Sequence, residues 1–433
     1  MLKRTCYSNN LKDGEEVVLA GWVHERRDLG GIKFILLRDR AGIAQITAPK
    51  KKVSEEIFKL MDSLGREWVI LVKGNTKSSP QAPGGIEVIP SEIEVISMAE
   101  PSLPLDPSEK VDADIDTRLD NRFMDVRKPR VTAIFKIRSE ILRAAREYLL
   151  SQDFVEIQTP KISASGTEGG TELFPLSYFE REAFLAQSPQ LYKQTMMATG
   201  MDRVFEMAHY FRAEESNTRR HLSESDAVDI EMSFIENEED VMYILENLVS
   251  HILKCVNENK KKEISLLGVE VNTPSTPFRR VNYDEAISLL QESGFNVHHG
   301  EDLGTESEKA LGNIVKEKYG DDLYFLTKYP LSTKPFYTNF DGEKARAFDL
   351  DYKGVEISSG GQRIHDVEVL KTRIKEKGLP LSSFEAYLKP FRFGMPPHGG
   401  FGLGIDRLVM QMLNLENIRE GVLFPHDRRR LEP

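Results

Sequence analysis

The sequence predicts an α+β protein in two parts: a small N-terminal β-barrel, then a larger domain in which helices flank a largely antiparallel sheet. Two observations support this. Residues 1–102 contain apolar runs of strand length around a single helical run. After residue 130, helix and strand patterns alternate, and several strand patterns follow one another directly, as in antiparallel sheets. A chain of 433 residues is long enough for two or three domains.

The order of elements in the first part suggests a particular barrel. Strands are expected at 17–23, 33–40, 42–48, 68–75 and 85–97, with a helix at 52–65. The helix is indicated by Val53, Ile57, Leu60 and Leu64, which recur at helical spacing. Three strands, a helix and two strands form the order of an OB-fold, a barrel that often binds nucleic acid on one face. A barrel without a ligand fits this order equally well.

Charge is distributed unevenly. Residues 1–52 hold 11 Lys and Arg against 6 Asp and Glu, whereas the rest of the chain holds 47 against 63. The formal net charge of −11 does not by itself suggest a nucleic-acid partner. A basic N-terminal segment on an acidic body is either a solvated surface, which composition alone favours, or a polyanion site at one end.

The second part begins after a segment of different composition. Residues 101–130 are rich in proline and charge, so we expect a hinge at 103–130 and a large domain at 131–433. That domain opens with an amphipathic helix. The apolar residues that mark the helix are Ile134, Ile137, Ile141, Ala144 and Tyr148. Strands are expected at 154–160, 181–189, 203–214, 227–235, 345–358 and 399–405.

Several classes of protein are disfavoured by what the sequence lacks. No apolar run reaches the ~18 residues of a membrane helix, and the N-terminus does not resemble a signal peptide, so a cytoplasmic location is expected. Cys6 and Cys255 cannot form a disulfide framework or a four-ligand zinc site. Because GxGxxG and P-loop patterns are absent, any bound ATP would have to be held in another way.

Two clusters in the large domain could bind phosphate. In the first, 211–232, Arg212 and Glu214 share one face of a strand, and an Arg-rich loop follows. Arginine suits phosphate because its guanidinium donates two hydrogen bonds at once, although a charged surface hairpin is the simpler alternative. In the second, 399–413, glycines precede Arg407 at the start of an apolar helix. The alternative there is a glycine-rich turn with Asp406 capping the helix.

Two further clusters contain charged side chains that could bind a metal ion or a substrate. Asp349, Glu356 and Ser359 flank an expected Tyr-Lys-Gly turn, and such oxygen ligands suit Mg²⁺. A bulge at 358–361 would be needed to bring Glu356 and Ser359 together, and a solvated edge strand is the competing interpretation. Lys193 follows a transition from strand to helix, where an exposed lysine would be ordinary.

Taken together and in this order, the clusters resemble class II aminoacyl-tRNA synthetases. The string at 154–162 resembles motif 1, with Pro160 at a dimer interface, while FRAE…RHL resembles motif 2 and GLGIDR resembles motif 3. The strings QSPQLYKQ, GTEGGTELFP (166–175) and IREGVLFPHDRRRLEP (418–433) are similar to the aspartate-specific branch of archaeal and eukaryotic type. The resemblance covers almost the whole chain.

The resemblance implies ATP-dependent activation of L-aspartate and its transfer to tRNA. Arg212 would bind the α-phosphate and the substrate carboxylate, and Arg407 would bind the γ-phosphate and cover one face of the adenine; these two are the catalytic candidates. The implied ATP contacts are Arg212, Ala213, Glu214, Arg220, His221, Leu222, Glu356, Gly404, Ile405, Asp406 and Arg407. Mg²⁺ would be bound by Asp349, Glu356 and Ser359.

The resemblance also implies an aspartate pocket. Lys193 and Arg363 would read the side-chain carboxylate, because a buried carboxylate needs cations and hydrogen bonds. The full implied set is Glu168, Gln190, Leu191, Tyr192, Lys193, Arg212, Asp229, Ser359 and Arg363. One position departs from many relatives: Ser225 follows Glu224, where they place a Phe that stacks on adenine. His221 is then the candidate for that role.

For tRNA, the resemblance implies a homodimer whose barrel reads the anticodon with Arg27, Phe34, Gln45 and Glu87. The alternative for Phe34 is the barrel core. His24 and Pro83 match positions that favour charging of tRNA(Asn) as well as tRNA(Asp), so a non-discriminating enzyme is expected, with an amidotransferase as a candidate partner. The alternatives are a strictly discriminating enzyme, an asparaginyl-tRNA synthetase, an asparagine synthetase and a non-catalytic RNA-binding paralogue.

Overall fold

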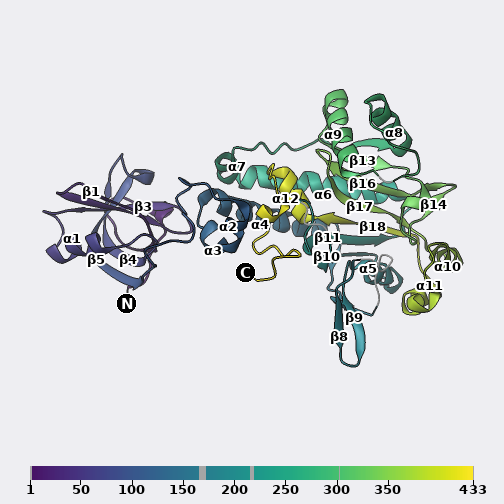
Figure 1. Ribbon diagram of the computed structural model, residues 1–433, viewed down its shortest axis with the longest axis horizontal. Helices are drawn as coiled ribbons and strands as arrows, with labels where there is room; N and C mark the ends of the chain where they lie inside the picture. The colour runs from purple at the N-terminus through teal and green to yellow at the C-terminus, as the bar shows by residue number, and fades with distance from the viewer. Residues whose placement is uncertain (1, 165–171, 215–218, 302, 433) are drawn as a thin grey trace. The chain divides into compact units, whose positions relative to one another are not determined.

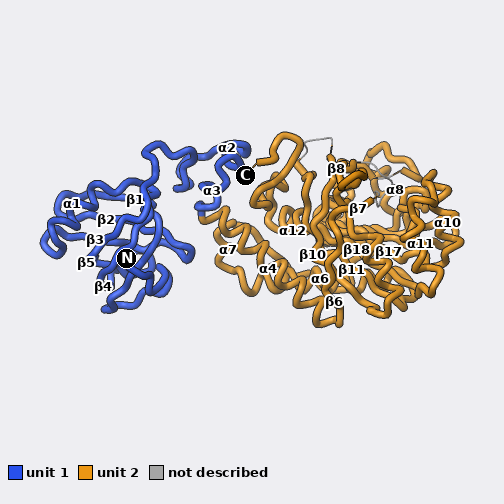
Figure 2. The backbone as a smooth tube through the Cα atoms, turned by 90° about the horizontal axis from the view of Figure 1, so that it is seen from below, with its two compact units in different colours: residues 1–128 blue, residues 129–433 orange. Residues whose placement is uncertain are grey.

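The computed structural model describes residues 2–164, 172–214, 219–301 and 303–432. It divides into two compact units, residues 1–128 and 129–433 (Figure 2). The division falls inside the segment 103–130 that the composition assigns to a hinge. Each unit has its own apolar core.

The first unit is a closed five-stranded barrel in the order β1-β2-β3-β5-β4. Its elements are β1 (Glu16–Asp28), β2 (Ile32–Arg38), β3 (Ile43–Pro49), α1 (Glu55–Ser63), β4 (Val69–Ser78) and β5 (Ile86–Ser97), with short 3-10 turns η1 (Ser8–Asn10) and η2 (Pro83–Gly85). Helix α1 begins at Glu55, three residues later than expected, because Ser54 caps it: the Ser54 side chain accepts the Ile57 N–H. The expected OB-fold is confirmed.

After the barrel, the proline-rich segment carries two short helices, α2 (Ile115–Asp120) and α3 (Arg122–Asp125), which its composition did not predict. They are held by a buried carboxylate. Asp125 lies within ion-pair distance of Arg122, at 2.8 Å, of Arg118, at 3.2 Å, and of Lys128, at 3.4 Å. A buried charge with three cations around it is compensated, so these ion pairs contribute to the order of the segment.

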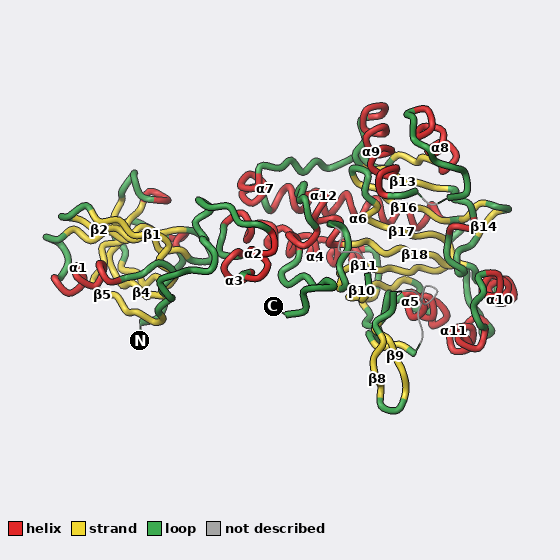
Figure 3. Tube along the Cα trace, in the orientation of Figure 1, coloured by secondary structure: helices red, strands yellow, loops and turns green. Residues whose placement is uncertain are grey.

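The second unit is built on an eight-stranded sheet in the order β12-β13-β16-β17-β18-β11-β10-β6 (Figure 3). Only β6–β10 and β12–β13 pair in parallel, so the expected antiparallel character is confirmed. The strands are β6 (Val155–Glu156), β10 (Arg203–Phe211), β11 (Glu224–Ser233), β12 (Arg279–Asn282), β13 (Leu323–Thr327), β16 (Ala347–Tyr352), β17 (Glu356–Arg363) and β18 (His398–Gly404).

Helices α4 (Pro129–Ser151), α6 (Glu238–Asn259) and α12 (Ile405–Met412) form an apolar core with this sheet. The remaining helices are α5 (Gln190–Met196), α7 (Lys261–Leu267), α8 (Tyr283–Glu292), α9 (Thr305–Tyr319), α10 (Val367–Glu376) and α11 (Glu385–Phe391), with 3-10 turns η3 (Met197–Thr199), η4 (Leu331–Thr333), η5 (Leu381–Phe384) and η6 (Ile418–Gly421). Smaller strands are β7 (Ile162–Ser163), β8 (Pro175–Tyr178), β9 (Arg181–Leu185), β14 (Phe340–Asp341) and β15 (Lys344–Ala345). Hairpin β8–β9 projects away from the large sheet (Figure 1).

Strand β11 shows how the sheet separates core from site. Val228, Ile230 and Met232 belong to the apolar core shared with the helices. Asp229 and Glu231 alternate with them, so their carboxylates point to the opposite face. Both acids are buried. Asp and Glu are rarely buried unless a cation pairs with them. This face of the sheet is therefore a candidate for the functional site.

Candidate functional site

A cavity lies on that face of the sheet, bounded by α5, β10, β11, β17, β18 and the start of α12. Strand β17 crosses it, with Glu356 at one end of the strand and Arg363 at the other. Most of the residues singled out from the sequence meet here. Those that line the cavity are Gln190, Lys193, Arg212, Glu214, Arg220, His221, Leu222, Asp229, Glu356, Ser359, Arg363, Gly404, Asp406 and Arg407.

Lys193 is buried at the Arg363 end of the cavity. Its Nζ donates to Asp229 Oδ1 across 2.7 Å and to the carbonyl of Phe401 across 3.0 Å. Glu231 Oε2 lies 3.7 Å from the same nitrogen. The side chain is only 3% exposed, so the alternative of an ordinary surface lysine is wrong. The helical position that looked unremarkable in the sequence faces inward.

Arg363 is the second buried cation of this end. Its Nε donates to Glu231 Oε1 across 3.0 Å, and its Nη2 donates to the carbonyl of Gly400 across 2.9 Å and to Gln190 Oε1 across 3.5 Å. Its guanidinium also lies 5.4 Å from the centre of the Tyr337 ring, a cation–π contact. Lys193 and Arg363 therefore share Glu231, and two cations and two carboxylates neutralise each other around the cavity wall.

A buried hydrogen-bond network supports Gln190 from behind. Its Nε2 donates to Gln194 Oε1 across 2.9 Å, and the Tyr387 hydroxyl donates to the same oxygen across 3.0 Å. Gln194 Nε2 lies 3.1 Å from His398 Nε2, while His398 Nδ1 lies 2.8 Å from the carbonyl of Pro396. Since a carbonyl can only accept, Nδ1 carries the proton and Nε2 accepts. Burial lowers the pKa of His398 to about 4, which keeps the imidazole neutral.

The other end of the cavity is rich in arginine. Arg407, in the first turn of α12, donates to the carbonyl of Glu356 across 2.9 Å, and the two side chains approach to 3.6 Å. Arg212 lies over the Tyr210 ring at 5.4 Å. His221 lines the same end, and burial lowers its pKa. A neutral imidazole beside arginines can cover an aromatic ring, so His221 fits the stacking role that the sequence offered for it.

The acidic cluster is formed by a bulge, but not where it was expected. Leu350 pairs with Ser358 and Asp351 pairs with Glu356, so Ile357 is the additional residue of β17. The expected position at 358–361 is therefore wrong by at least one residue. The bulge changes the phase of the strand, so that Glu356 and Ser359 both reach the cavity. The expected turn between the strands is present, at Lys353 and Gly354, both with positive φ.

Asp349 lies on the next strand, β16, and does not line the cavity. It pairs in register with Ser359, and its Oδ2 accepts from Lys334 Nζ across 2.7 Å. Its Oδ1 is buried with no hydrogen-bond partner among the described residues. Burial, with the nearby charge of Asp349, raises the pKa of Glu356. Both carboxylates are of the oxygen-ligand type that suits Mg²⁺, although the described residues contain no cluster of three or more metal-binding side chains.

Some predicted contacts are not brought to the cavity. Leu191 packs in an apolar cluster and Tyr192 is 38% exposed. Ile405 is buried in the core, and Ala213 donates its N–H to the carbonyl of Glu172. These four do not line the cavity, so side-chain contacts from them are not supported. Glu168 lies outside the described residues.

The structure adds residues that the motifs did not reveal. Lys334, Tyr337 and Asp226 line the cavity, and Glu231 ties its two cations together. Alternation with Asp229 would have identified Glu231, because residues two apart on a strand share a face. Lys334 and Tyr337 come from an irregular segment after η4, where no periodicity predicts the direction of a side chain.

In the barrel, the proposed anticodon residues lie on neighbouring strands. Arg27 pairs in register with Phe34, and Gln45 pairs with Glu87. Gln45 Nε2 lies 3.4 Å from Glu87 Oε2. Phe34 is half-buried and does not belong to the barrel core, which is instead filled by its neighbours such as Ile35. The alternative of a core phenylalanine is therefore wrong.

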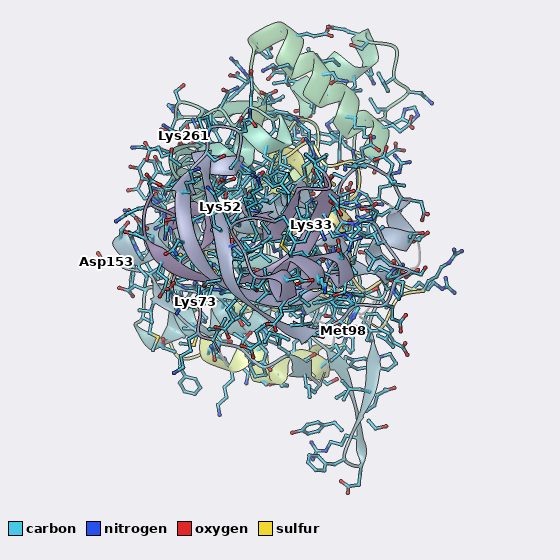
Figure 4. All side chains as sticks on the ribbon, turned by 90° about the vertical axis from the view of Figure 1, so that its left-hand side faces the viewer. Lys33, Lys52, Lys73, Met98, Asp153 and Lys261 are labelled. Carbon is cyan, nitrogen blue, oxygen red and sulfur yellow. The ribbon has the colours of Figure 1, made fainter. Side chains whose placement is uncertain are left out.

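Three lysines of the same barrel, Lys33, Lys52 and Lys73, are labelled in Figure 4. Lys33 is buried, so its charge is not exposed for contact with RNA. Its ammonium group pairs with Asp62, donates to the carbonyl of Phe58 across 3.0 Å and lies over the Phe58 ring. The positive charge of Lys33 is therefore neutralised by its contacts with helix α1.

Comparisons with known proteins agree with this geometry. Residues 114–428 match the family described as tRNA synthetases class II (D, K and N), and residues 17–96 match an OB-fold nucleic acid binding domain. The chain is 59% identical to the aspartate–tRNA(Asp) ligase of Pyrococcus horikoshii, covering 99% of this chain and 100% of that protein. It is 55% identical to the aspartate–tRNA(Asp/Asn) ligase of Methanopyrus kandleri, covering 98% and 97%.

Among solved structures, the asparaginyl-tRNA synthetase of P. horikoshii complexed with asparaginyl-adenylate has a TM-score of 0.93 at 37% identity, covering 100% of both chains. Within the part of the chain that the structure describes, no helix combines the length and apolar character needed to cross a bilayer.

Proposed function

The chain belongs to the class II tRNA synthetases of the D, K and N group, and from that premise we propose that it activates L-aspartate with ATP and transfers the aspartyl group to tRNA. The relatives named as aspartate–tRNA ligases match over nearly their whole length. The observation that carries the choice of amino acid is that two buried cations, Lys193 and Arg363, line one end of a cavity whose other end holds Arg212 and Arg407.

Aspartate fits the Lys193–Arg363 end because a buried carboxylate needs positive charge and hydrogen-bond donors. Asp229 and Glu231 hold the two cations in place without the substrate. Asparagine would direct amide N–H groups at groups that can only donate, and a polar site rejects such an analogue strongly. This separates the proposal from an asparaginyl-tRNA synthetase, the activity named for the similar solved structure. Gln190 and Asp229 would face the ammonium group.

The reaction proceeds by positioning and charge neutralisation. An α-carboxylate oxygen of aspartate attacks the α-phosphorus of ATP, the bond to the bridging oxygen breaks, and pyrophosphate leaves with its electrons. Arg212 would bind the α-phosphate oxygens, where charge builds, and Arg407 would bind the γ-phosphate. A hydroxyl of the terminal ribose of tRNA then attacks the acyl carbon and AMP leaves.

The nucleotide would enter with Mg²⁺. Glu356 and Ser359 would hold the ion beside the phosphates, with Asp349 contributing its buried Oδ1, which has no hydrogen-bond partner among the described residues. Bound Mg²⁺ supplies positive charge that offsets the charge of the phosphate oxygens. Lys334, 2.7 Å from Asp349, supports that carboxylate from the protein side.

The barrel would read the anticodon, with Phe34 stacking on a base and Arg27, Gln45 and Glu87 making polar contacts. We also propose that it accepts tRNA(Asn). His24 Nδ1 accepts from Arg38 Nη1 across 3.0 Å, and burial lowers the pKa of His24, so the neutral ring keeps its proton on Nε2. A small N–H donor restricts the neighbouring base less than a bulky side chain would, and Pro83 is the first residue of the turn η2.

Charging of tRNA(Asn) with aspartate would require a later step. The product carries the wrong amino acid for its anticodon, so an amidotransferase would have to convert its side-chain carboxylate to an amide. Comparable charging of transcripts of tRNA(Asp) and tRNA(Asn) is expected. Charging of tRNA(Asp) alone would reject this part of the proposal and leave a discriminating enzyme.

A homodimer would form at motif 1. Val155 and Ile162, on either side of Pro160, are 45% and 43% exposed, and exposed apolar side chains that gather on one segment are typical of an interface. Light scattering should give twice the monomer mass of 49.3 kDa.

The central test is ATP–pyrophosphate exchange with aspartate and with asparagine under identical conditions. Exchange that depends on aspartate and is negligible with asparagine is expected. Exchange driven by asparagine would replace the proposal with an asparaginyl enzyme, and exchange with neither would favour a non-catalytic paralogue.

A further inference from the structure

Arg138 is a buried cation that belongs to none of the motifs and does not line the cavity. It lies on α4, the helix that precedes motif 1, and its side chain is 11% exposed. We propose that Arg138 is a positioning residue for the nucleotide: its guanidinium fixes the start of α12, and with it Arg407, against strand β11 and the C-terminal segment. The inference rests on the proposed function, because it assigns Arg138 to the ATP end of that site.

The guanidinium joins three segments that are far apart in the sequence. Nη2 donates to Asp226 Oδ2 of β11 across 2.6 Å. Nη1 lies 2.6 Å from Asp406 Oδ1 of α12 and donates to the carbonyl of Gly421 in η6 across 3.1 Å. Planar guanidinium groups suit such a junction because their donors point in fixed directions, which a flexible ammonium group cannot reproduce.

The Asp406 carboxylate is also bonded directly to the backbone of Asp226. Asp406 Oδ2 accepts the backbone N–H of Asp226 across 2.9 Å. Both residues line the cavity, and Asp406 immediately precedes Arg407. Burial raises the pKa of Asp406, and the charge of Arg138 opposes that shift. Without Arg138, the buried Asp406 carboxylate would lose its cation, and the first turn of α12 would lose the guanidinium bridge to β11 and keep the bond from the Asp226 N–H.

The third contact extends to the segment that carries His221. Ile418 of η6 lines the cavity and donates its N–H to the carbonyl of Arg219. Further along the C-terminal segment, His426 accepts the N–H of Ser223 through its carbonyl, and its Nδ1 lies 2.8 Å from Glu224 Oε1. Arg138 thus contacts the C-terminal segment, and that segment in turn contacts both ends of the Arg219–Glu224 stretch, which includes His221.

A purely structural cross-link is the competing explanation, and kinetics separate the two. A general loss of packing would weaken ATP and aspartate binding together and would lower thermal stability. A positioning role predicts a selective effect, because the three contacted segments border the Arg407 end, whereas Lys193 and Arg363 are held by Asp229 and Glu231 at the other end.

The test compares Arg138→Met and Arg138→Lys with Arg143→Met in the full chain. Arg143 is a matched control on the same helix: it is 48% exposed and bonds Glu140 across 2.7 Å. In ATP–pyrophosphate exchange, R138M should raise KM for ATP at least about tenfold, as expected for the loss of hydrogen bonds between charged groups. KM for aspartate should stay within about twofold, since its contacts are untouched. R138K should fall in between, and R143M should match the wild type.

ATP binding without amino acid, measured by isothermal titration, gives a second readout that does not require the proposed activity. R138M should weaken it by the same factor. Equal increases in both KM values, or unchanged ATP binding, would overturn the inference. If R138M does not fold, R138K decides, because it retains the charge and lacks only the planar fork. Absence of aspartate-dependent exchange in the wild type would instead reject the proposed function.

Discussion

Arg363 and Glu231 form a buried ion pair in which the guanidinium Nε donates to Oε1 across 3.0 Å. Lys193 approaches the other oxygen of the same carboxylate to 3.7 Å. The site for an acidic substrate is therefore assembled in advance by acids of the chain itself. Such preorganisation means that the cations need not move when aspartate arrives, and it makes the site costly to disturb.

Replacing Lys193 should lower both the free energy of unfolding and the rate of aspartate activation, for different physical reasons. Lys193→Met leaves Asp229 buried without its cation, so the free energy of unfolding should fall by about 3 to 5 kcal/mol. Aspartate-dependent exchange should fall at least about a hundredfold in kcat/KM, because the substrate carboxylate loses a charged donor. Urea unfolding and pyrophosphate exchange measure the two effects.

The double variant Lys193→Met with Asp229→Asn is the control. Removing the uncompensated charge of Asp229 should recover much of the lost free energy of unfolding without restoring activity. Recovery of activity would mean that Lys193 serves only to neutralise Asp229.

His398 should make stability depend on pH. Its pKa is about 4 in the folded protein and about 6.5 when unfolded. As the pH falls below 6.5, the unfolded chain therefore takes up a proton that the folded protein resists. The contribution of His398 is fully present above pH 6.5 and is lost towards pH 4, by about 3 kcal/mol in total. The difference in unfolding free energy between the wild type and His398→Asn should narrow over this range, and a constant difference would contradict the assignment.

Sequence reasoning succeeded where the local pattern and the environment agree. The barrel order followed from strand-length apolar runs. Arg212 and Asp229, which the family resemblance assigned to the site, both line the cavity, although Arg212 comes just after β10 and does not lie on a strand as expected. It failed where tertiary contacts decide. The local pattern left a surface lysine open as the alternative for Lys193, because its helix carries no acid and its partner Asp229 comes from β11; only the family resemblance assigned Lys193 to the aspartate pocket.

The bulge at Ile357 could not be placed for a related reason. Residues 356–363 are mostly small or polar, and such a run does not fix the register of a strand. The pairing with β16 fixes it instead. The role of Arg138 could not be predicted from the sequence, because its three partners lie more than eighty residues away in the chain.

Phe34 should act on tRNA alone. Phe34→Ala removes a half-buried ring outside the barrel core, so folding should be nearly unaffected. Loss of one stacking contact is worth about 1 to 3 kcal/mol, which raises KM for tRNA roughly 5- to 150-fold. Pyrophosphate exchange without tRNA should match the wild type. Ile35→Ala, in the core, should instead lower the melting temperature, and an effect of F34A on exchange would refute a role confined to tRNA.

Two glycines of β18 should give a graded series at the aspartate end. A Cβ on Gly402 would lie 3.3 Å from Asp229 Oδ1, close enough to displace the carboxylate by a few tenths of an ångström. A Cβ on Gly400 would lie 2.1 Å from the carbonyl oxygen of Ile230, a distance that the backbone must relieve. Gly304→Ala is the control, since that position has negative φ and open space around it.

Gly402→Ala should therefore fold and raise KM for aspartate more than KM for ATP, because Asp229 positions Lys193 and would face the ammonium group. Gly400→Ala should lose stability outright, since Glu231 and the strand backbone both lie within the excluded distance. Melting temperatures and the two KM values report the outcomes. If G402A changed KM for ATP and aspartate equally, Asp229 would not face the amino acid. The carboxylate would then serve only to balance the charge of Lys193.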